Sequence, residues 1–146
     1  MLKENILWDE NLGLAIATIT DTTHGEVFTA SAMCSPEDSD MKSKLTGQEI
    51  AWRRAYIKYL KYLKNYYSVQ YKALNDFQKN IQNCKHYNPE FQIENLLHKE
   101  IQLVYNTYIN LKKKVTAEKQ ALNQYISKKA EIYGKIRERR AHKGDS

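Results

Sequence analysis

Proline, glycine and cysteine are all scarce in this chain of 146 residues. It contains two prolines, five glycines and two cysteines. Because proline and glycine are the residues that most often end a helix or a strand, this scarcity predicts long, uninterrupted elements. No stretch approaches the ~20 consecutive apolar residues of a membrane span, and Met1–Asn5 is too polar to begin a secretory signal. We therefore expect a cytoplasmic protein of about one domain.

The familiar signatures of catalytic and metal sites are also missing. The sequence has no nucleophile elbow, Walker loop, glycine fingerprint or HExxH motif. Its four histidines are scattered along the chain, and His86, two residues from Cys84, supplies too few ligands for a zinc site. The acidic run at 37–40 is typical of a solvated linker more than of a cation site. We expect no enzyme, no metal and no cofactor.

Residues 1–45 have the composition of a β-rich head and an acidic connector. The segments 6–8, 14–20 and 27–34 are rich in β-branched and apolar residues and are separated by turn-like segments. Gly25 ends the second of these turns, where it can adopt a positive φ. We predict a three-stranded antiparallel sheet. Three short strands cannot cover both of their faces, so one face needs the helices or another chain.

Residues 46–140 predict two long helices that fold back on each other, with a turn near 84–90. Thr46 and Glu49 have the spacing of a capping box, and Asn88-Pro89 is typical of a second helix start. Apolar residues recur at heptad spacing in both halves, most regularly in the second. The prediction is an α+β chain: the sheet, then an antiparallel two-helix coiled-coil hairpin, then a frayed tail at 141–146. We expect Thr46 to lie near Ser127.

The predicted hairpin separates the two cysteines. Cys34 lies in the head and Cys84 at the far turn, with a helix of nearly forty residues, about 55 Å, between them. A disulfide requires Cα atoms within about 7 Å. The sequence therefore predicts no intrachain disulfide, which is consistent with a reducing compartment.

Charge divides the chain into two regions. Residues 1–45 carry three lysines and eight acids, a net −5, whereas residues 46–146 carry twenty Lys/Arg and nine acids, a net +11. A basic helical region favours an anionic partner such as a nucleotide, a nucleic acid or an acidic protein surface. The alternative is that the lysines solvate a long hairpin, and that the acidic head packs on its basic end.

Two basic clusters accompany aromatic residues and are candidates for phosphate binding. The first lies at 52–62, where an aromatic seam with basic flanks is the alternative interpretation. The second, at 135–140, overhangs the first helix beside the connector, and follows Gly134. A glycine deep in a helix either marks the helix end or permits a close approach to the backbone. Trp52 or Tyr133 would be the stacking platform. The candidate ligand-binding residues are Arg53, Arg54, Tyr133, Arg137, Arg139 and Arg140.

Residues 32–40 (AMCSPEDSD) and 46–58 (TGQEIAWRRAYIK) resemble a family of small tailed-phage proteins from Gram-positive hosts. Within such proteins, a β head followed by two long helices resembles the Thoeris anti-defence sponges. That resemblance implies a homo-oligomer in the cytoplasm of an infected bacterium that sequesters cyclic ADP-ribose-type immune signals. It is a resemblance of architecture, and it transfers no ligand-contacting residue to this chain.

Three functions are open at this point. The first is a phage-type anti-defence protein that sequesters a small anionic cyclic nucleotide. The second is a basic helical inhibitor or adaptor that uses the same face to bind nucleic acid, a host protein that handles nucleic acid, or a host defence protein. The third is a plain coiled-coil scaffold. We expect a homodimer or a larger even assembly in each case, because a three-stranded sheet leaves an open face and open edges.

Overall fold

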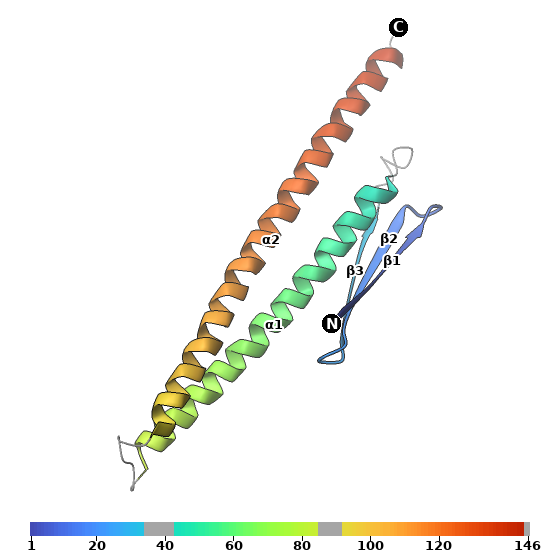
Figure 1. Ribbon diagram of the computed structural model, residues 1–146. Helices are drawn as coiled ribbons and strands as arrows, with labels where there is room; N and C mark the ends of the chain where they lie inside the picture. The colour runs from blue at the N-terminus through green and yellow to red at the C-terminus, as the bar shows by residue number, and fades with distance from the viewer. Residues whose placement is uncertain (34–42, 85–91, 145–146) are drawn as a thin grey trace. The chain divides into compact units, whose positions relative to one another are not determined.

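The computed structural model describes residues 1–33, 43–84 and 92–144. Strands β1 (Leu2–Asp9), β2 (Leu14–Asp21) and β3 (Glu26–Met33) precede helices α1 (Lys44–Gln82) and α2 (Gln92–Gly144) (Figure 1). The predicted α+β class, an antiparallel sheet followed by a long helical hairpin, is confirmed. Neither helix has an apolar stretch long enough to span a membrane within the residues described.

The strands form a meander in the order β1-β2-β3, with both pairs antiparallel. Alternation of side chains places Ala15, Ala17 and Ile19 of β2 on one face, where all three are fully buried. Ala30 and Ala32 of β3 are buried beside them. The helix-facing surface of β2 and β3 is therefore built mainly from small side chains.

The β2–β3 turn is organised around the buried carboxylate of Asp21. Its side chain accepts a hydrogen bond from the backbone N–H of Thr23 at 2.9 Å, and His24 Nδ1 lies 2.7 Å from its other oxygen. The hydrogen bond from His24 is the main reason that the pKa of Asp21 lies below its usual value. Gly25 adopts a φ of 71°, as the sequence predicts, and donates its N–H to the Asp21 carbonyl.

The first half of α1 packs closely on this sheet because its contact residues are also small. Gly47, Ala51 and Ala55 recur every four residues, so they form one stripe along the helix. Both alanines are fully buried, and a Cβ at Gly47 would lie only 3.0 Å from a ring carbon of Trp8. The alanines of the sheet and of α1 form a single core with Ile19.

The start of α1 differs from the prediction. The helix begins at Lys44, and the Ser43 hydroxyl accepts a hydrogen bond from the Thr46 N–H at 3.2 Å. Ser43 is therefore the N-cap, and the predicted capping box is wrong. Glu49 accepts a hydrogen bond from Arg53 at 2.8 Å, one turn further along, instead of reaching back. At the other end of the chain, α2 continues to Gly144.

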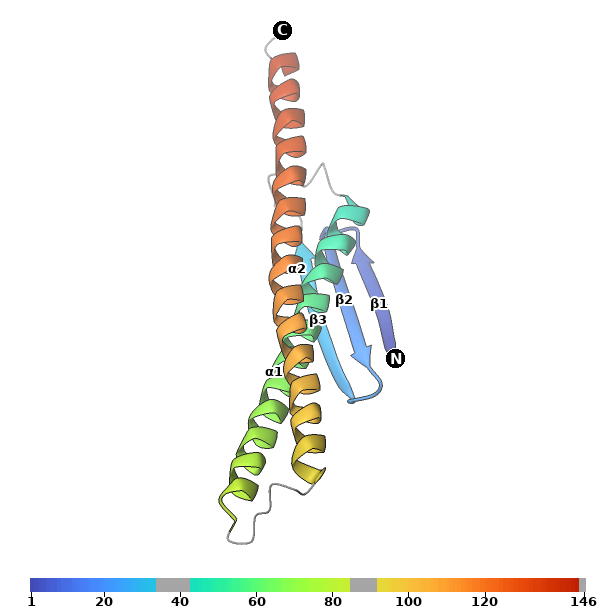
Figure 2. The ribbon, with the colours of Figure 1, turned by 60° about the vertical axis from the view of Figure 1, so that its left-hand side comes forward.

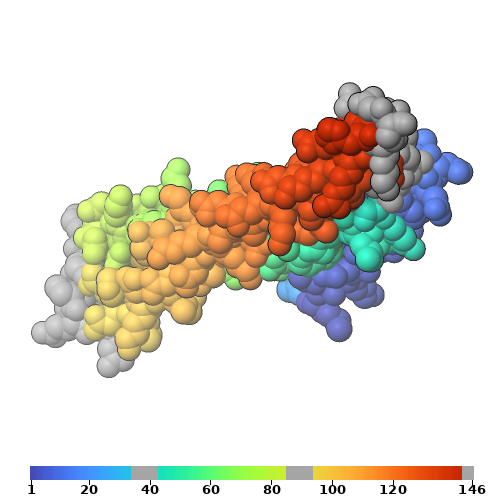
Figure 3. Space-filling view, turned by 90° about the horizontal axis from the view of Figure 1, so that it is seen from above, coloured from blue at the N-terminus to red at the C-terminus, as the bar shows by residue number. Residues whose placement is uncertain are grey.

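The molecule divides into two compact units: residues 1–59 with 117–146, and residues 60–116. In the first unit, which we call the sheet unit, α1 lies between the sheet and α2, as Figures 1 and 3 show. Tyr133 of α2 donates a hydrogen bond to the Thr46 hydroxyl. The expectation that Ser127 lies near Thr46 is thus wrong by almost two turns of α2. It assumed that the helices fold symmetrically about the turn near 84–90, whereas side-chain packing determines which residues of the two helices lie side by side.

The second unit, which we call the distal unit, contains only the two helices. Their seam buries Leu60 of α1 and Ile101, Val104 and Val115 of α2. Tyr71 and Tyr105 contact each other across it, with ring centroids 5.0 Å apart. Except for Tyr105, these residues occupy the heptad positions predicted from the sequence. Ile132, another such position but in the sheet unit, is 41% exposed, which the sequence did not predict.

Several predicted features lie outside the described residues: the acidic run at 37–40, the Asn88-Pro89 helix start and Cys34. The expected contact between this acidic run and the basic end of α2 therefore also lies outside the described residues. Cys84 is an exposed free thiol.

Candidate anion-binding site

The candidate residues on α2 begin with Tyr133, which anchors this helix to the first turn of α1. Its hydroxyl donates to the Thr46 hydroxyl at 3.2 Å, and Thr46 is 9% exposed. The first turn of α1 contains no acidic residue. A helix N-terminus presents backbone N–H groups and a partial positive charge. Tyr133 therefore lies beside a position that electrostatically favours an anion.

Arg137 and Arg140 lie on the same side of α2 as Tyr133. Residues spaced at i, i+4 and i+7 share one face of a helix, so these three form a stripe. Both arginine side chains are exposed. Arg139 is two residues from Arg137, which rotates it about 200° around the helix axis. The structure thus groups two of the three predicted arginines of α2 and directs the third elsewhere.

The two candidate arginines of α1 point to different neighbours. Arg53 donates to Glu49 at 2.8 Å, and its guanidinium carbon lies 5.4 Å from the ring centroid of Tyr125 on α2. Arg54 donates to the backbone carbonyl of Ser31 in β3 at 2.8 Å. The geometry therefore does not bring the six predicted residues together into one cradle in a single protomer.

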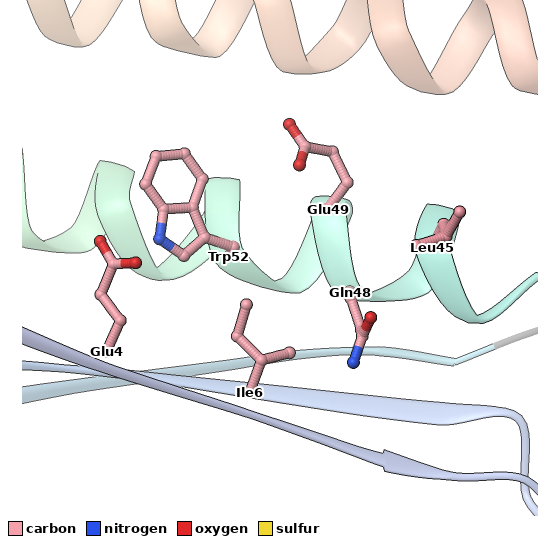
Figure 4. A pocket seen from close by; sticks show the side chains of 6 residues that line it. All are labelled: Glu4, Ile6, Leu45, Gln48, Glu49 and Trp52. Atoms are coloured by element: carbon pink, nitrogen blue, oxygen red, sulfur yellow. The ribbon is translucent and has the colours of Figure 1, made fainter.

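Trp52 does not have the surroundings of a phosphate-site platform. Its ring stacks on Tyr56, with centroids 5.0 Å apart and an interplanar angle of 9°. It also borders a pocket of about 390 Å³ between β1 and α1, which is lined by Glu4, Ile6, Leu45, Gln48, Glu49 and Trp52 (Figure 4). Two carboxylates in this lining repel phosphate, so the pocket is unsuited to the predicted ligand.

Sequence reasoning missed Tyr125, which contacts Arg53, and Lys129, which contacts Tyr125. Tyr125 provides the ring beneath the Arg53 guanidinium, and the Lys129 ammonium lies 5.6 Å from the same ring centroid. The i, i+4 spacing of Tyr125 and Lys129 was visible in the sequence. The proximity of Tyr125 to Arg53 was not, because it depends on how α1 and α2 align.

Gly134 fits neither of the two explanations that its sequence context suggested. The helix continues ten residues beyond it, to Gly144. A Cβ at Gly134 would meet no atom within 4 Å. In the described part of the protomer, the glycine therefore leaves open surface beside Tyr133.

No group of three or more potential metal ligands occurs among residues 1–33, 43–84 and 92–144. The candidate residues that share one face of α2 are Tyr133, Arg137 and Arg140, and of these Tyr133 contacts the first turn of α1. Comparison of the chain with protein-family models, with curated proteins and with solved structures finds no match.

Proposed function

We propose that this protein is a phage-type anti-defence sponge: a non-catalytic, homo-oligomeric protein of the infected cell's cytoplasm that sequesters a small anionic cyclic nucleotide. The observation that carries this proposal is the stripe of Tyr133, Arg137 and Arg140, which continues from the contact between Tyr133 and Thr46. The resemblance of the sheet-plus-two-helices architecture to the Thoeris anti-defence sponges supports the choice of ligand class.

The chemistry of the stripe suits a nucleotide. An arginine guanidinium can hold two phosphate oxygens at once through its planar fork of donors. A tyrosine ring offers a surface for stacking a base. The first turn of α1, free of acidic residues, adds a favourable field for the phosphate. Arg137 and Arg140 would hold the phosphate groups, and Tyr133 would contact the base or ribose.

The test compares two faces of the same helix. The double change Arg137→Ala with Arg140→Ala should weaken binding of cyclic ADP-ribose by about 2–4 kcal/mol, because two charge-assisted contacts are lost. Isothermal titration calorimetry measures the affinity. The matched control is Lys135→Ala with Arg139→Ala, which removes the same charge from the other side of α2 and should leave the affinity close to that of the wild type.

Two outcomes would overturn this proposal. One is an unchanged affinity in the Arg137/Arg140 variant. The other is an equal loss in both double variants, which would show that the total charge of the helix matters and not this face. In both double variants the assembly mass, measured by light scattering, should equal that of the wild type, since neither pair of residues lies on the apolar seam.

Nucleic-acid binding is the second candidate, and the consecutive lysines of α2 favour it. Lys112, Lys113 and Lys114 are all exposed, more than five turns from Tyr133. Affinity for DNA or RNA through many such contacts falls steeply with salt because counterions are released. Strong salt dependence with single-stranded DNA, together with no thermal shift by cyclic ADP-ribose, would favour this function over the sponge.

A further inference from the structure

The two edges of the sheet, β3 and β1, differ in how their outward-facing backbone groups are hydrogen-bonded within the sheet unit. On β3, two side chains of α1 bind the outward-facing backbone. Arg54 donates to the Ser31 carbonyl at 2.8 Å, and Lys58 donates to the Thr29 carbonyl at 2.7 Å. These contacts occupy acceptors that a further strand would need. The β3 edge is thereby protected from pairing with another chain.

On β1 the outward-facing backbone groups can be identified from the strand pairing. The Thr22 N–H donates to the Met1 carbonyl at 3.1 Å, so these two opposed residues form a hydrogen-bonded pair. In an antiparallel ladder such pairs alternate, so the odd-numbered residues of β1 bond to β2. The outward groups belong to the even-numbered residues, Leu2, Glu4, Ile6 and Trp8. No hydrogen bond among the described residues ends on them.

The side chains along this edge are also incompletely covered. The even-numbered residues of β1 lie on the same face as Ala15 and Ala17 of β2, which α1 buries completely. Leu2 and Ile6, however, are 36% and 37% exposed. Figure 2 shows why: β1 lies beside α1, while β2 and β3 lie beneath it. The pocket bordered by Glu4, Ile6 and Trp52 marks this uncovered strip (Figure 4).

We infer that β1 pairs with β1 of a second copy of this chain, antiparallel and centred on Ile6, to form a continuous six-stranded sheet. The charged residues of β1 favour a second copy of this strand as the partner, and they determine which residues of the two copies lie opposite each other. A pair centred on Ile6 places Lys3 of each copy opposite Asp9 of the other, twice by symmetry, with both side chains on the outer face. It also places the two Ile6 side chains opposite each other.

The alternative registers are less favourable. Centring on Glu4 places the two Glu4 carboxylates directly opposite each other, and like charges in that position are destabilising. Centring on Leu7 opposes Glu4 and Glu10, another like-charged pair. Centring on Asn5 leaves Lys3 opposite Leu7. Only registers in which even residues oppose even residues allow the outward groups to bond, and the Ile6 register alone among these pairs Lys3 with Asp9.

The consequence for the pocket follows directly. A second β1 strand lies about 4.8 Å from the first, so it closes the open side of each pocket and covers Ile6. This inference concerns the sheet edge and holds whether or not the protein binds a nucleotide.

The first experiment removes one outward donor from each edge in turn. Ile6→Pro deletes an N–H that points away from β2, so the sheet of the protomer keeps its own hydrogen bonds. The matched control is Thr29→Pro, which deletes an outward N–H on the β3 edge. By native mass spectrometry, the wild type and Thr29→Pro should share one even-numbered assembly, and Ile6→Pro should give a lower subunit number. A monomeric wild type, or an unchanged mass for Ile6→Pro, would contradict the inference.

The second experiment tests the register without disturbing the backbone, and also decides the case if a proline variant fails to fold. In a background with Cys34→Ser and Cys84→Ser, Ile6→Cys should form an interchain disulfide, since opposed residues have Cα atoms about 5.5 Å apart. Glu4→Cys should not, because the two positions would be about 13 Å apart along the strands. No cross-link at position 6, or a cross-link at position 4 instead, would overturn the proposed pairing.

Discussion

The two halves of α1 bury different kinds of side chain, although they belong to one continuous helix. Residues 44–59 contact a sheet through alanines that are fully buried. Residues 60–82 pack on the other helix of the distal unit, and here Tyr66, Val69 and Phe77 remain 37%, 69% and 53% exposed. A sheet of small residues lets a helix approach closely only when the helix also presents small residues. A helix pair accommodates long tyrosines whose hydroxyls stay in water.

This difference predicts that stability resides mainly in the sheet unit. Its core excludes water and contains Ile19, the largest side chain that is fully buried among the described residues. The distal unit buries a single seam of aliphatic residues. Three experiments, ordered from the largest expected effect to the smallest, test whether the two regions respond as differently as their packing suggests.

The largest effect should come from emptying the centre of the sheet unit. Ile19→Ala should lower the free energy of unfolding by about 2–5 kcal/mol, because it removes buried methyl groups and leaves a cavity. Urea denaturation followed by circular dichroism measures the change. The control is Leu103→Ala in the distal unit, where the side chain is 60% exposed, with an expected change within about 0.5 kcal/mol. An equal loss of unfolding free energy in the two variants would show that the difference in packing between the two units does not make the sheet unit more stable.

A smaller effect should come from overfilling the alanine interface. Ala55→Leu adds three carbons where the helix side chain is fully buried, and should lower the free energy of unfolding by about 1–3 kcal/mol. Ala73→Leu makes the same change at an exposed position of the same helix, so its effect should stay within about 0.5 kcal/mol. Denaturant midpoints compare the two. If Ala55→Leu is as stable as Ala73→Leu, α1 does not pack tightly on the sheet.

The last experiment concerns acid. The pKa of Asp21 is lowered in the folded protein, so its interaction with His24 stabilises the fold above the unfolded pKa, near 3.9. That stabilisation is lost as the pH falls through the lower, folded pKa. Denaturant midpoints at a series of pH values should therefore show a wild-type advantage over Asp21→Asn near pH 6. The advantage should shrink toward pH 3.

His24→Ala serves as the partner variant, since it removes the main cause of the lowered pKa. Like Asp21→Asn, it should weaken the pH dependence of the denaturant midpoint in the acid range. The double variant should differ little from Asp21→Asn alone. Wild-type and Asp21→Asn curves that stay parallel through the acid range would contradict this account of the turn. Amide hydrogen exchange at low pH should rise first at the ends of β2 and β3 that flank the turn after Asp21.

Much of the fold could be predicted from the sequence because it follows from local patterns. Short segments rich in β-branched and apolar residues predicted the three strands, and a glycine at position 25 predicted the turn with positive φ. Heptad spacing predicted the seam positions Leu60, Val104 and Val115, which are buried. The N-cap was wrong because Ser43 and Thr46 are both good capping residues, and local preference does not choose between them.

The candidate site was less accessible to such reasoning. Six residues were selected for their chemistry, but side-chain direction determines which of them can act together. Helical periodicity alone separates Arg139 from Arg137 and Arg140, once the helix is known to continue. The partners of Arg53 and Arg54, by contrast, come from α2 and β3, far along the chain.

By itself, the sequence of this protein determined its elements, their order and the division into an acidic head and a basic helical region. These are consequences of side-chain periodicity, chain breakers and charge, all of which act over a few residues. Only the tertiary structure decided that Arg54 and Lys58 bind the β3 edge while β1 keeps its outward groups unbonded within the described residues. That asymmetry arises because α1 crosses the sheet over β2 and β3, and such packing depends on the alanines of all three elements together.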